Sequence, residues 1–554
     1  MLRKIRTALA LVFWLGITVL FLDVSGALHA WLAWMAKLQF LPAVLAANVG
    51  VTVLVIVLTL VVGRIYCSVI CPLGVMQDAF NRLGARLVRD KAKRRFGRFR
   101  YWYPRWAKVV RWAVFALVLA AIVVGAGAVV RVFAPYSSYG RIVTTLLRPG
   151  VDALNNVLAD LSAQHDDYTF SHVELWMRSG AALAVALTSL IVVGGMAVWR
   201  GRFYCNTICP VGTILGWLAR RSILRIHIDA DRCTKCGLCE RRCKAMAIDA
   251  GRRHVDLTRC VDCFDCLDAC RTGALSYGID KPLSVPATDG KAAAGGKAAA
   301  DSKAKSEGKP IAKDVTNLAE DKAKSEGEST ANNVLNASDG TSRRAFLATM
   351  ATLTVDAKLR ADSKIVDGGL AVIADKKPYR RETPICPPGA LSLRNLSQKC
   401  TGCLLCVSAC PNDVLRPASD LTHFLQPTLS YERNHCRPEC HACSDVCPAG
   451  AILPLGKTHE EKKARKSSLK IGRAVWIADN CVPLTDGVSC GNCARHCPTG
   501  AITMVPSRPD DPRSPRIPTV DDERCIGCGA CEHLCPSRPY SAIHVEGIEV
   551  QREI

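Results

Sequence analysis

GRIYCSVICPLG at residues 63–74 and GRFYCNTICPVG at residues 201–212 are two copies of one twelve-residue pattern, which returns after 138 residues. Each copy closes a long uncharged stretch of the chain. A pattern that recurs at such an interval is an internal repeat, in which each copy marks one structural unit. The repeat predicts two related units, each made of two membrane helices that end in a Cys-x-x-x-Cys-Pro turn.

The N-terminal part of the chain has the composition of a membrane domain. A helix needs about 20 apolar residues to cross a bilayer, with a lower limit near 17. Three of four uncharged runs are long enough, and the shorter first run has a signal peptide as its alternative, although no cleavage site is clear. We therefore expect a multi-pass bundle of four transmembrane helices over residues 1–222. The runs are residues 7–22, 38–63, 112–130 and 179–199.

Loop charges predict how these helices are oriented. Residues 82–111 hold twelve Lys and Arg against one acid, whereas residues 134–178 hold three basic and five acidic residues. Basic loops stay on the cytoplasmic side of a membrane. The N-terminus, both Cys-Pro turns and the segment after residue 212 are therefore expected in the cytoplasm. We attribute the basic loop to topology and anionic lipid, and expect no nucleic acid as a partner.

The histidines give no indication of haem. None of the twelve lies in the four uncharged runs, and no Cys-x-x-Cys-His is present, so no pair of axial ligands is predicted. His29 stands beside Trp31 and Trp34 and fits an interfacial aromatic belt. A role for His29 at a quinone site is the alternative.

The two repeated turns carry four cysteines that are candidate redox or cofactor thiols. They could ligate a metal or cluster, pair as a redox-active disulfide, or contact a quinone. A purely structural role, with Pro72 and Pro210 fixing the turns, is the remaining interpretation. The sequence names no other catalytic residue. The four thiols are those of Cys67, Cys71, Cys205 and Cys209.

Residues 223–280 carry two C-x2-C-x2-C-x3-C runs. In bacterial two-cluster ferredoxins, three close thiolates of such a run hold one [4Fe-4S] cluster and the fourth cysteine ligates the other. Zinc sites instead draw on two separated pairs. Lys244 and Arg271 replace the usual proline, and we expect these cations to stabilise the clusters and raise their potentials. The predicted ligand sets are Cys233, Cys236 and Cys239 with Cys270, and Cys260, Cys263 and Cys266 with Cys243.

A linker separates this module from the C-terminal part. Residues 281–341 are rich in Lys, acidic residues, Ala, Gly and Ser and lack aromatic residues and cysteine, so they cannot bury enough apolar surface to fold. The segment at residues 342–383 opens with Ser-Arg-Arg-Ala-Phe-Leu, which matches the twin-arginine export motif. Such a signal moves a domain that has folded around its cofactor, and a chance Arg-Arg pair is the alternative.

Residues 384–554 carry four more cysteine runs, each followed by proline. These predict four [4Fe-4S] clusters, six in the whole chain. Because the outer two runs keep the strict spacing and the inner two are stretched, we expect outer to pair with outer and inner with inner; adjacent pairing is the alternative. Cys386 has no cysteine neighbours and is expected to be structural. The runs are Cys400, Cys403, Cys406, Cys410; Cys436, Cys440, Cys443, Cys447; Cys481, Cys490, Cys493, Cys497; and Cys525, Cys528, Cys531, Cys535.

The helices, Cys-Pro turns and two-cluster segment together resemble NapH-type quinol dehydrogenase subunits of periplasmic nitrate reductase systems. The second half, with its Arg-Arg motif, the Pro-Pro-Gly-Ala of residues 387–390 and four cluster runs, is similar to the NapG-type exported ferredoxin and its methylamine-utilisation counterpart. The resemblance implies a membrane α-helical bundle joined to α+β two-cluster ferredoxin-like domains, in a bacterial inner membrane. This chain departs from the pattern by fusing both halves and by its weakly apolar export segment.

By resemblance, the membrane half takes electrons from quinol and the quinone pool, and an exported polyferredoxin passes them to a periplasmic reductase. Two alternatives stay open. One is a cytoplasmic conduit between soluble ferredoxin and quinone, and the other is a cluster-containing assembly or regulatory protein. No ligand in the sequence explains how electrons would cross from the cytoplasmic clusters to the exported ones.

Overall fold

The computed structural model describes residues 1–23, 26–87, 103–166, 169–175, 178–279, 366–367, 371–372 and 375–554. The predicted linker, the Arg-Arg motif and most of the basic loop lie outside these residues. The described residues belong to one compact unit, which joins the chain up to residue 280 with the chain from residue 365.

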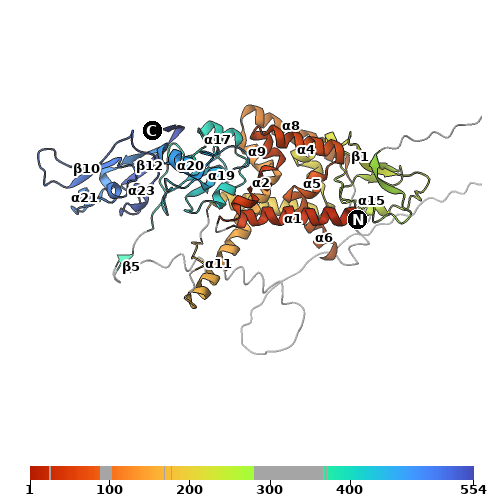
Figure 1. Ribbon diagram of the computed structural model, residues 1–554, viewed down its shortest axis with the longest axis horizontal. Coiled ribbons are helices and arrows are strands. Elements are labelled where there is room, and N and C mark those ends of the chain that lie inside the picture. The colour runs from red at the N-terminus through yellow and green to blue at the C-terminus, as the bar shows by residue number, and fades with distance from the viewer. Residues whose placement is uncertain are drawn as a thin grey trace, which may run out of the picture. The chain divides into compact units, whose positions relative to one another are not determined.

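Three described helices are long and apolar enough to cross a membrane. At a rise of 1.5 Å per residue each is about 30 Å long, which matches the hydrocarbon thickness of a bilayer. The first uncharged run, which looked marginal, belongs to a helix that starts at Leu2 and includes the buried Arg6. The three helices are α1 (Leu2–Leu22), α8 (Arg105–Val124) and α12 (Gly180–Arg200) (Figure 1).

The second uncharged run is divided between α3 (Phe40–Leu45) and α4 (Val49–Val62). Ala47 takes a positive φ of 54°, and the Asn48 side chain accepts a hydrogen bond from the Val51 amide at 3.2 Å, which caps α4. At 14 residues α4 is about 21 Å long, shorter than the hydrocarbon core. The prediction of four membrane-spanning helices is therefore not confirmed, since three of the described helices have the required length.

The two repeated turns fold alike. Gly63 and Gly201 end the preceding helices with φ of 87° and 67°, a conformation that glycine adopts without strain. A short helix carrying the first cysteine follows, and Pro72 or Pro210 then opens the next helix at a position that suits proline. The turn helices are α5 (Ile65–Val69) and α13 (Phe203–Thr207), and the helices after them are α6 (Pro72–Leu87) and α14 (Pro210–Ala219).

The segment between α8 and α12 forms a second group of helices around buried aromatic and arginine side chains. Tyr136, Arg131 and Arg141 are almost fully inaccessible to solvent. The group packs on α12, α6 and α1. Its members are α9 (Gly127–Phe133), α10 (Pro135–Ile142), a π-helical turn (Val143–Leu147) and α11 (Arg148–Ala163), and α2 (His29–Lys37) packs on α1.

Both cysteine-rich regions are built from short antiparallel strand pairs and single-turn helices (Figure 1). In the first region β1 (Leu224–Ile228) pairs with β4 (Leu275–Ile279), and β2 (Ile248–Asp249) pairs with β3 (His254–Val255), next to α15 (Leu238–Arg242). In the C-terminal region the strand pairs are β7 (Leu415–Pro417) with β8 (Pro427–Leu429), β10 (Ile502–Pro506) with β11 (Arg516–Val520), and β9 (Leu469–Trp476) with β12 (Ile543–Glu553). Its helices include α17 (Leu393–Lys399), α18 (Leu405–Ser408), α19 (Ala442–Val446), α20 (His459–Ser468), α22 (Asn492–Arg495) and α23 (Ala530–Leu534).

The two cysteine-rich regions contact opposite ends of α1. Near its start, Arg3 forms ion pairs with Asp265 at 3.0 Å and Asp268 at 2.8 Å in the first region. Near its end, Phe21 packs against Gly140, where the Cys403 carbonyl of the C-terminal region also lies. A helix of 21 residues separates its ends by about 30 Å.

The two cysteine-rich regions also contact opposite ends of the segment formed by α3 and α4. The Ile223 amide of the first region donates to the Leu60 carbonyl at 2.8 Å, at the end of α4. Before its start, a methyl group on Gly450 of the C-terminal region would lie 3.3 Å from the Ala46 side chain. Two helices thus have one cysteine-rich region at each end.

Candidate iron-sulfur sites

The first C-terminal site joins three cysteines of one run with the fourth cysteine of the next. These four line a hollow of about 360 Å³ whose other walls are apolar, including Leu396, Leu404 and Ile452. All the apolar walls are buried, and α18 and α19 pack together beside the hollow. The four cysteines are Cys400, Cys403, Cys406 and Cys447.

Three more sites follow the same rule. Hollows of about 310 Å³ and 290 Å³ are each lined by three cysteines of one run and the last cysteine of its neighbour. In the fourth group the thiols interact electrostatically with one another, where α22 packs on α23. The sets are Cys436, Cys440, Cys443 with Cys410; Cys525, Cys528, Cys531 with Cys497; and Cys481, Cys490, Cys493 with Cys535.

The expected pairing of outer with outer and inner with inner runs was therefore wrong, and adjacent runs pair. The physical reason is chain reach. Each fourth cysteine follows a single-turn helix, and that helix packs on the matching helix of the adjacent run, α18 on α19 and α22 on α23. The longer spacing of the two inner runs adds residues between cysteines of the same run. It does not change which other run packs beside it.

The first region shows the predicted exchange of fourth cysteines. The Cys239 thiol interacts with those of Cys236 and Cys270, and the Cys266 thiol interacts with those of Cys263 and Cys243. Cys260 also interacts with Cys243. These contacts group Cys236 and Cys239 with Cys270, and Cys260, Cys263 and Cys266 with Cys243, as the spacing predicts. The place of Cys233 in the first set stays a prediction.

The surroundings of these thiols suit [4Fe-4S] clusters. Backbone amides donate to sulfur from Ala247 to Cys243, from Ala501 to Cys497 and from Ala542 to Cys535, each at 3.3 Å. Amide hydrogen bonds to sulfur are one of the contacts by which a protein tunes a cluster.

The thiols also need a metal to ionise. Burial raises the pKa of Cys403 to about 12 and that of Cys400 to about 11, so these groups become thiolates when a metal replaces the proton. Within the described residues, no three His, Cys, Asp or Glu side chains lie close enough to hold a single metal ion. A cube spreads its ligands around four irons, so its cysteines stand further apart than those of one ion.

The sites differ in their access to solvent. Cys236 is exposed and Cys233 and Cys239 are half-buried, whereas Cys260, Cys263 and Cys266 are buried. The site with Cys233, Cys236 and Cys239, called the outer site of the first region from here on, is therefore accessible to solvent. The site with Cys260, Cys263 and Cys266, called the inner site, faces the helices. In the C-terminal region, the Cys400 site lies against the helices through Gly140, and the half-buried Cys490 and Cys493 belong to another site.

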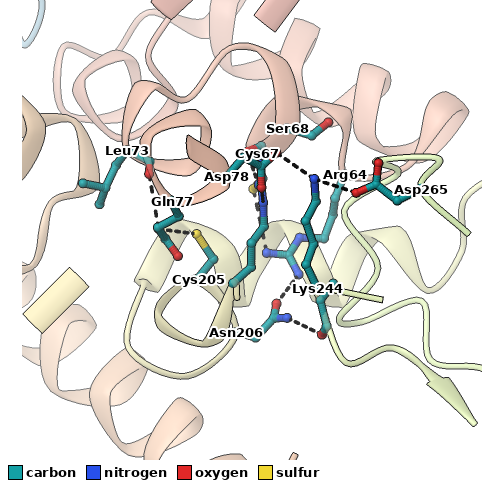
Figure 2. Close-up of polar contacts among 12 residues, drawn as sticks. Arg64, Cys67, Ser68, Leu73, Gln77, Asp78, Cys205, Asn206, Lys244 and Asp265 are labelled. Carbon is teal, nitrogen blue, oxygen red and sulfur yellow. Dashed lines mark hydrogen bonds and ion pairs between the residues drawn. The ribbon is translucent and has the colours of Figure 1, made fainter. Parts of the chain in front are cut away.

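The four thiols of the paired turns are also brought together. Each has an exposed fraction of 4 to 5%, and none is in a disulfide. Figure 2 shows Gln77 of α6, in the first repeat, reaching Cys205 of the second, with Nε2 3.1 Å from Sγ. On the other side, Arg202 of the second repeat donates to the Cys67 carbonyl. Each repeat thus binds the turn of the other.

Asp78 is the centre of the charged contacts at this point. Its carboxylate lies 2.7 Å from Arg202, 3.1 Å from Arg6 and 2.9 Å from Lys244, and all of these side chains are buried. Lys244 also pairs with Asp265 at 2.9 Å (Figure 2). This lysine, which replaces the usual proline, therefore ties the first cysteine-rich region to α6.

Arg271, the other residue that replaces proline, is exposed. Cys386 is buried, and its Sγ is absent from the linings of the three hollows above. His29 is buried with Nδ1 2.8 Å from Asp23, and its Nε2 has no hydrogen-bond partner within the described residues.

The sequence patterns did not lead us to predict a role for the buried arginines. Arg64 and Arg202 stand in the repeated pattern itself, next to the glycines, so the repeat carried a signal for them. Arg131, Arg141 and Arg148 hold the C-terminal region, and no pattern in the sequence singles them out. Arg141 donates to the Gly402 carbonyl at 3.2 Å and Arg131 to the Ser397 carbonyl at 3.4 Å.

Comparison with known families gives the same assignment of cofactor. A 4Fe-4S dicluster domain matches residues 399–451 and 488–538, each of which spans two adjacent cysteine runs or parts of them. A 4Fe-4S binding domain matches residues 226–249, and another family with that description matches residues 45–94 and 181–228. No solved structure is similar at a significant level.

Curated relatives show the family to which the chain belongs. The methylamine utilization ferredoxin-type protein MauM of Methylophilus methylotrophus is 34% identical over 183 residues, which cover 32% of this chain and 77% of that protein. The ferredoxin-type protein NapG of Escherichia coli K12 is 31% identical, covering 30% of this chain and 75% of NapG. The chain belongs to the MauM/NapG family.

The MauM/NapG assignment makes this chain an iron-sulfur electron-transfer protein of ferredoxin type. The MauM and NapG matches each cover about a third of this chain. The NapF ferredoxin-type protein of Escherichia coli K12 is also similar, at 27% identity over 28% of this chain and 82% of NapF.

Proposed function

We propose that this chain is a membrane-anchored quinol dehydrogenase component that takes electrons from quinol and passes them through [4Fe-4S] clusters to a periplasmic reductase. The observation that carries the proposal is the position of the two cysteine-rich regions at opposite ends of α1 and α4. Bound clusters supply one-electron transfer on either side of the membrane. The helices and turns between them hold the two sets of sites in fixed positions.

Loop charge supports the proposed topology. The C-terminal region contacts the segment at residues 134–178, whose charge balance predicts the periplasmic side. Arg148 donates to the Ser408 carbonyl and Arg178 pairs with Asp413. The first region instead contacts the ends of α1 and α4 that lie next to the basic loop. An exported C-terminal domain, as the Arg-Arg motif predicts, is consistent with these contacts.

A hollow of about 430 Å³ between α8, α14 and the first region is our candidate quinol site. Two indole rings, of Trp112 and Trp217, stand half-exposed at its mouth, as aromatic side chains do at a membrane interface. Lys108 and His254 are exposed polar groups in its lining. Arg259, also in the lining, is the neighbour of the buried Cys260, so a bound quinol would lie beside the inner site.

The chemistry of a quinol fits such a place. Its oxidation releases two electrons and two protons, and the electrons must leave one at a time. His254 is exposed and can take a proton to solvent, whereas Arg111 is occupied by the carbonyls of Gly212, Thr213 and Thr258. We therefore assign to Arg111 a structural role in the wall of this hollow, and to His254 the exchange of protons with solvent.

The exposed outer site with Cys236 favours one alternative, a conduit in which soluble ferredoxin exchanges electrons with quinone through this chain. Two experiments separate the proposals. Reporters that are active on one side of the membrane, fused at the C-terminus, test the exported domain; activity of the cytoplasmic reporter alone would refute the periplasmic outlet. A quinol analogue added to the purified protein should reduce its clusters, and clusters that ignore both quinol and quinone would leave an assembly or regulatory role.

A further inference from the structure

We propose that Cys67, Cys71, Cys205 and Cys209 together hold one additional [4Fe-4S] cluster, which the two repeats share. The site is inferred from the geometry of the turns alone. Its use as an electron relay across the helices rests on the proposed function above.

The four thiols form one group. Each of the six possible pairs among them interacts electrostatically, whether the two cysteines come from one turn or from both. This is the same mutual proximity that the ferredoxin-type sets show, as between Cys403, Cys400 and Cys447. Each repeat supplies two thiols, which is half of the ligand set of a cube.

Every sulfur in the group accepts a hydrogen bond. The Gly212 amide donates to Cys209 at 3.3 Å, and the Gly74 amide, at the matching place in the other repeat, donates to Cys71. Arg64 Nη2 lies 3.8 Å from Cys67 Sγ, and Gln77 donates to Cys205. Four buried sulfurs, each with a donor, resemble the cluster ligands above and suit thiolates better than neutral thiols, which are weak acceptors.

Buried arginines surround the group. Arg64 and Arg202 are both fully buried. A methyl group on Gly74 would lie 3.2 Å from Arg202, and one on Gly212 would lie 3.1 Å from Arg64, so each repeat's arginine lies over the other repeat's turn. Buried cations are costly unless an anion faces them. Arg202 already faces the Asp78 carboxylate, whereas Arg64 donates to the neutral oxygens of Asn206 and Thr258. A cube with four thiolates carries net negative charge and would supply an anion beside Arg64.

Two other uses of the thiols fit less well. The described residues include no group of three metal-binding side chains close enough for a single ion, and the four thiols are free of disulfides. The family described as a 4Fe-4S binding domain matches each repeat separately, at residues 45–94 and 181–228, but each of these segments contains two cysteines. A complete ligand set therefore requires both repeats at one cluster.

The shared site lies between the two cysteine-rich regions. On one side, Arg202 interacts with both Cys205 and Cys263 of the inner site. On the other side, Tyr66 interacts with Cys71 and Tyr136, and Tyr136 interacts with Cys403. A cluster here would accept one electron from one neighbour and give it to the other, with no bond made or broken and no proton transferred. It supplies the missing step between the two ends of the helices.

Iron counting on the full chain, purified without oxygen, tests the site. The wild type should contain about four irons more per chain than the ferredoxin-type runs account for. The double variant C67S/C205S should lose about four irons and one cluster signal in electron paramagnetic resonance. The matched control C386S, which also removes a buried thiol, should lose none.

The proposal is wrong if the clusters of the ferredoxin-type runs account for all the iron in the wild-type protein. It is also wrong if a C67S/C205S variant keeps the wild-type iron content, or if a disulfide joins these cysteines in the anaerobically purified wild type. Because the wild-type count needs no variant, misfolding of the double variant cannot decide the result. Quinol reduction is scored separately: an extra cluster in a protein that quinol does not reduce confirms the site and refutes the proposed function.

Discussion

The Nζ atom of Lys244 lies 2.9 Å from Oδ2 of Asp78, and both side chains are buried. The residue that follows the last cysteine of a cluster run is therefore bonded to the helix that follows the first repeated turn. This contact fixes the inner site of the first region against α6.

Replacing Lys244 by alanine should destabilise this junction and change the inner site. Asp78 keeps Arg6 and Arg202, so we expect a loss of about 3 kcal/mol, the lower end for breaking a buried ion pair. Because Lys244 interacts with Cys263, removing its charge should also lower the midpoint potential of that cluster. Thermal unfolding and a redox titration measure the two effects. The exposed Lys235→Ala control should change neither, and equal values for the two variants would contradict the junction.

Adjacent pairing of cysteine runs predicts which double variants are additive. Cys447→Ser and Cys400→Ser remove ligands of one cluster, so combining them should cost little more iron than either alone. Cys447→Ser with Cys436→Ser affects two clusters, and the losses should add. Iron content and spin quantification give the answer. Additive losses in both double variants would instead support the pairing of distant runs, in which Cys447 ligates the cluster of the Cys481 run.

Arg141→Ala should loosen the C-terminal region from the helices. The guanidinium is buried and donates to the carbonyls of Arg131 at 2.7 Å and Gly402 at 3.2 Å, which would be left unpaired at a cost of about 1–3 kcal/mol. Hydrogen exchange around residues 400–410 should speed up. Arg433→Ala, which breaks an exposed pair with Glu174, is the control and should cost at most about 1 kcal/mol. Unchanged exchange in R141A would mean that this contact does not hold the domain.

Trp112→Ala should weaken quinol binding, because it removes an indole ring from the mouth of the candidate hollow. We expect a rise of about tenfold in the KM for a soluble quinol analogue, equivalent to about 1.4 kcal/mol, with iron content unchanged. Trp106 lies on the same helix with similar exposure but outside the hollow, so W106A is the matched control. Equal kinetics for W112A and W106A would remove the hollow as the quinol site.

Iron should leave the sites in an order set by their exposure. The outer site of the first region, with the exposed Cys236, should lose its iron to a chelator before the site with the buried Cys260, Cys263 and Cys266. Absorbance decay, followed by mass spectrometry of alkylated cysteines, identifies the sites that open first. Simultaneous labelling of Cys236 and Cys263 would show that burial does not control release.

Spacing in the sequence was enough to predict [4Fe-4S] binding and to find the repeat, because both depend on residues close together along the chain. Pairing between runs depends instead on which single-turn helices pack together, and nothing in the spacing of the stretched Cys436 and Cys481 runs records that contact. The prediction that the second uncharged run forms one membrane-spanning helix was not confirmed, for a related reason. Its composition is apolar throughout, and the interruption comes from one side-chain cap at Asn48 and the positive φ of Ala47.

The arginines show a further limit. Arg64 and Arg202 repeat in the pattern, yet a basic residue near a membrane helix is usually explained by topology, and its burial becomes visible only when both repeats are folded together. Arg141 has no repeat and no motif, and its partner in the C-terminal region is the carbonyl of Gly402, 261 residues later. Long-range contacts to backbone atoms leave no trace in residue identity.

The crossed arginines also constrain how the sequence can change over time. Arg64 lies over the turn that contains Gly212, and Arg202 lies over the turn that contains Gly74. A side chain added at Gly74 would meet the Cys67 carbonyl of its own repeat at 2.3 Å and Arg202 of the other repeat at 3.2 Å, and one added at Gly212 would meet the Cys205 carbonyl at 2.1 Å and Arg64 at 3.1 Å. Each turn is therefore constrained both by its own backbone and by the arginine of the other repeat. We expect relatives to keep both glycines and both arginines together, even where other residues of the two repeats differ.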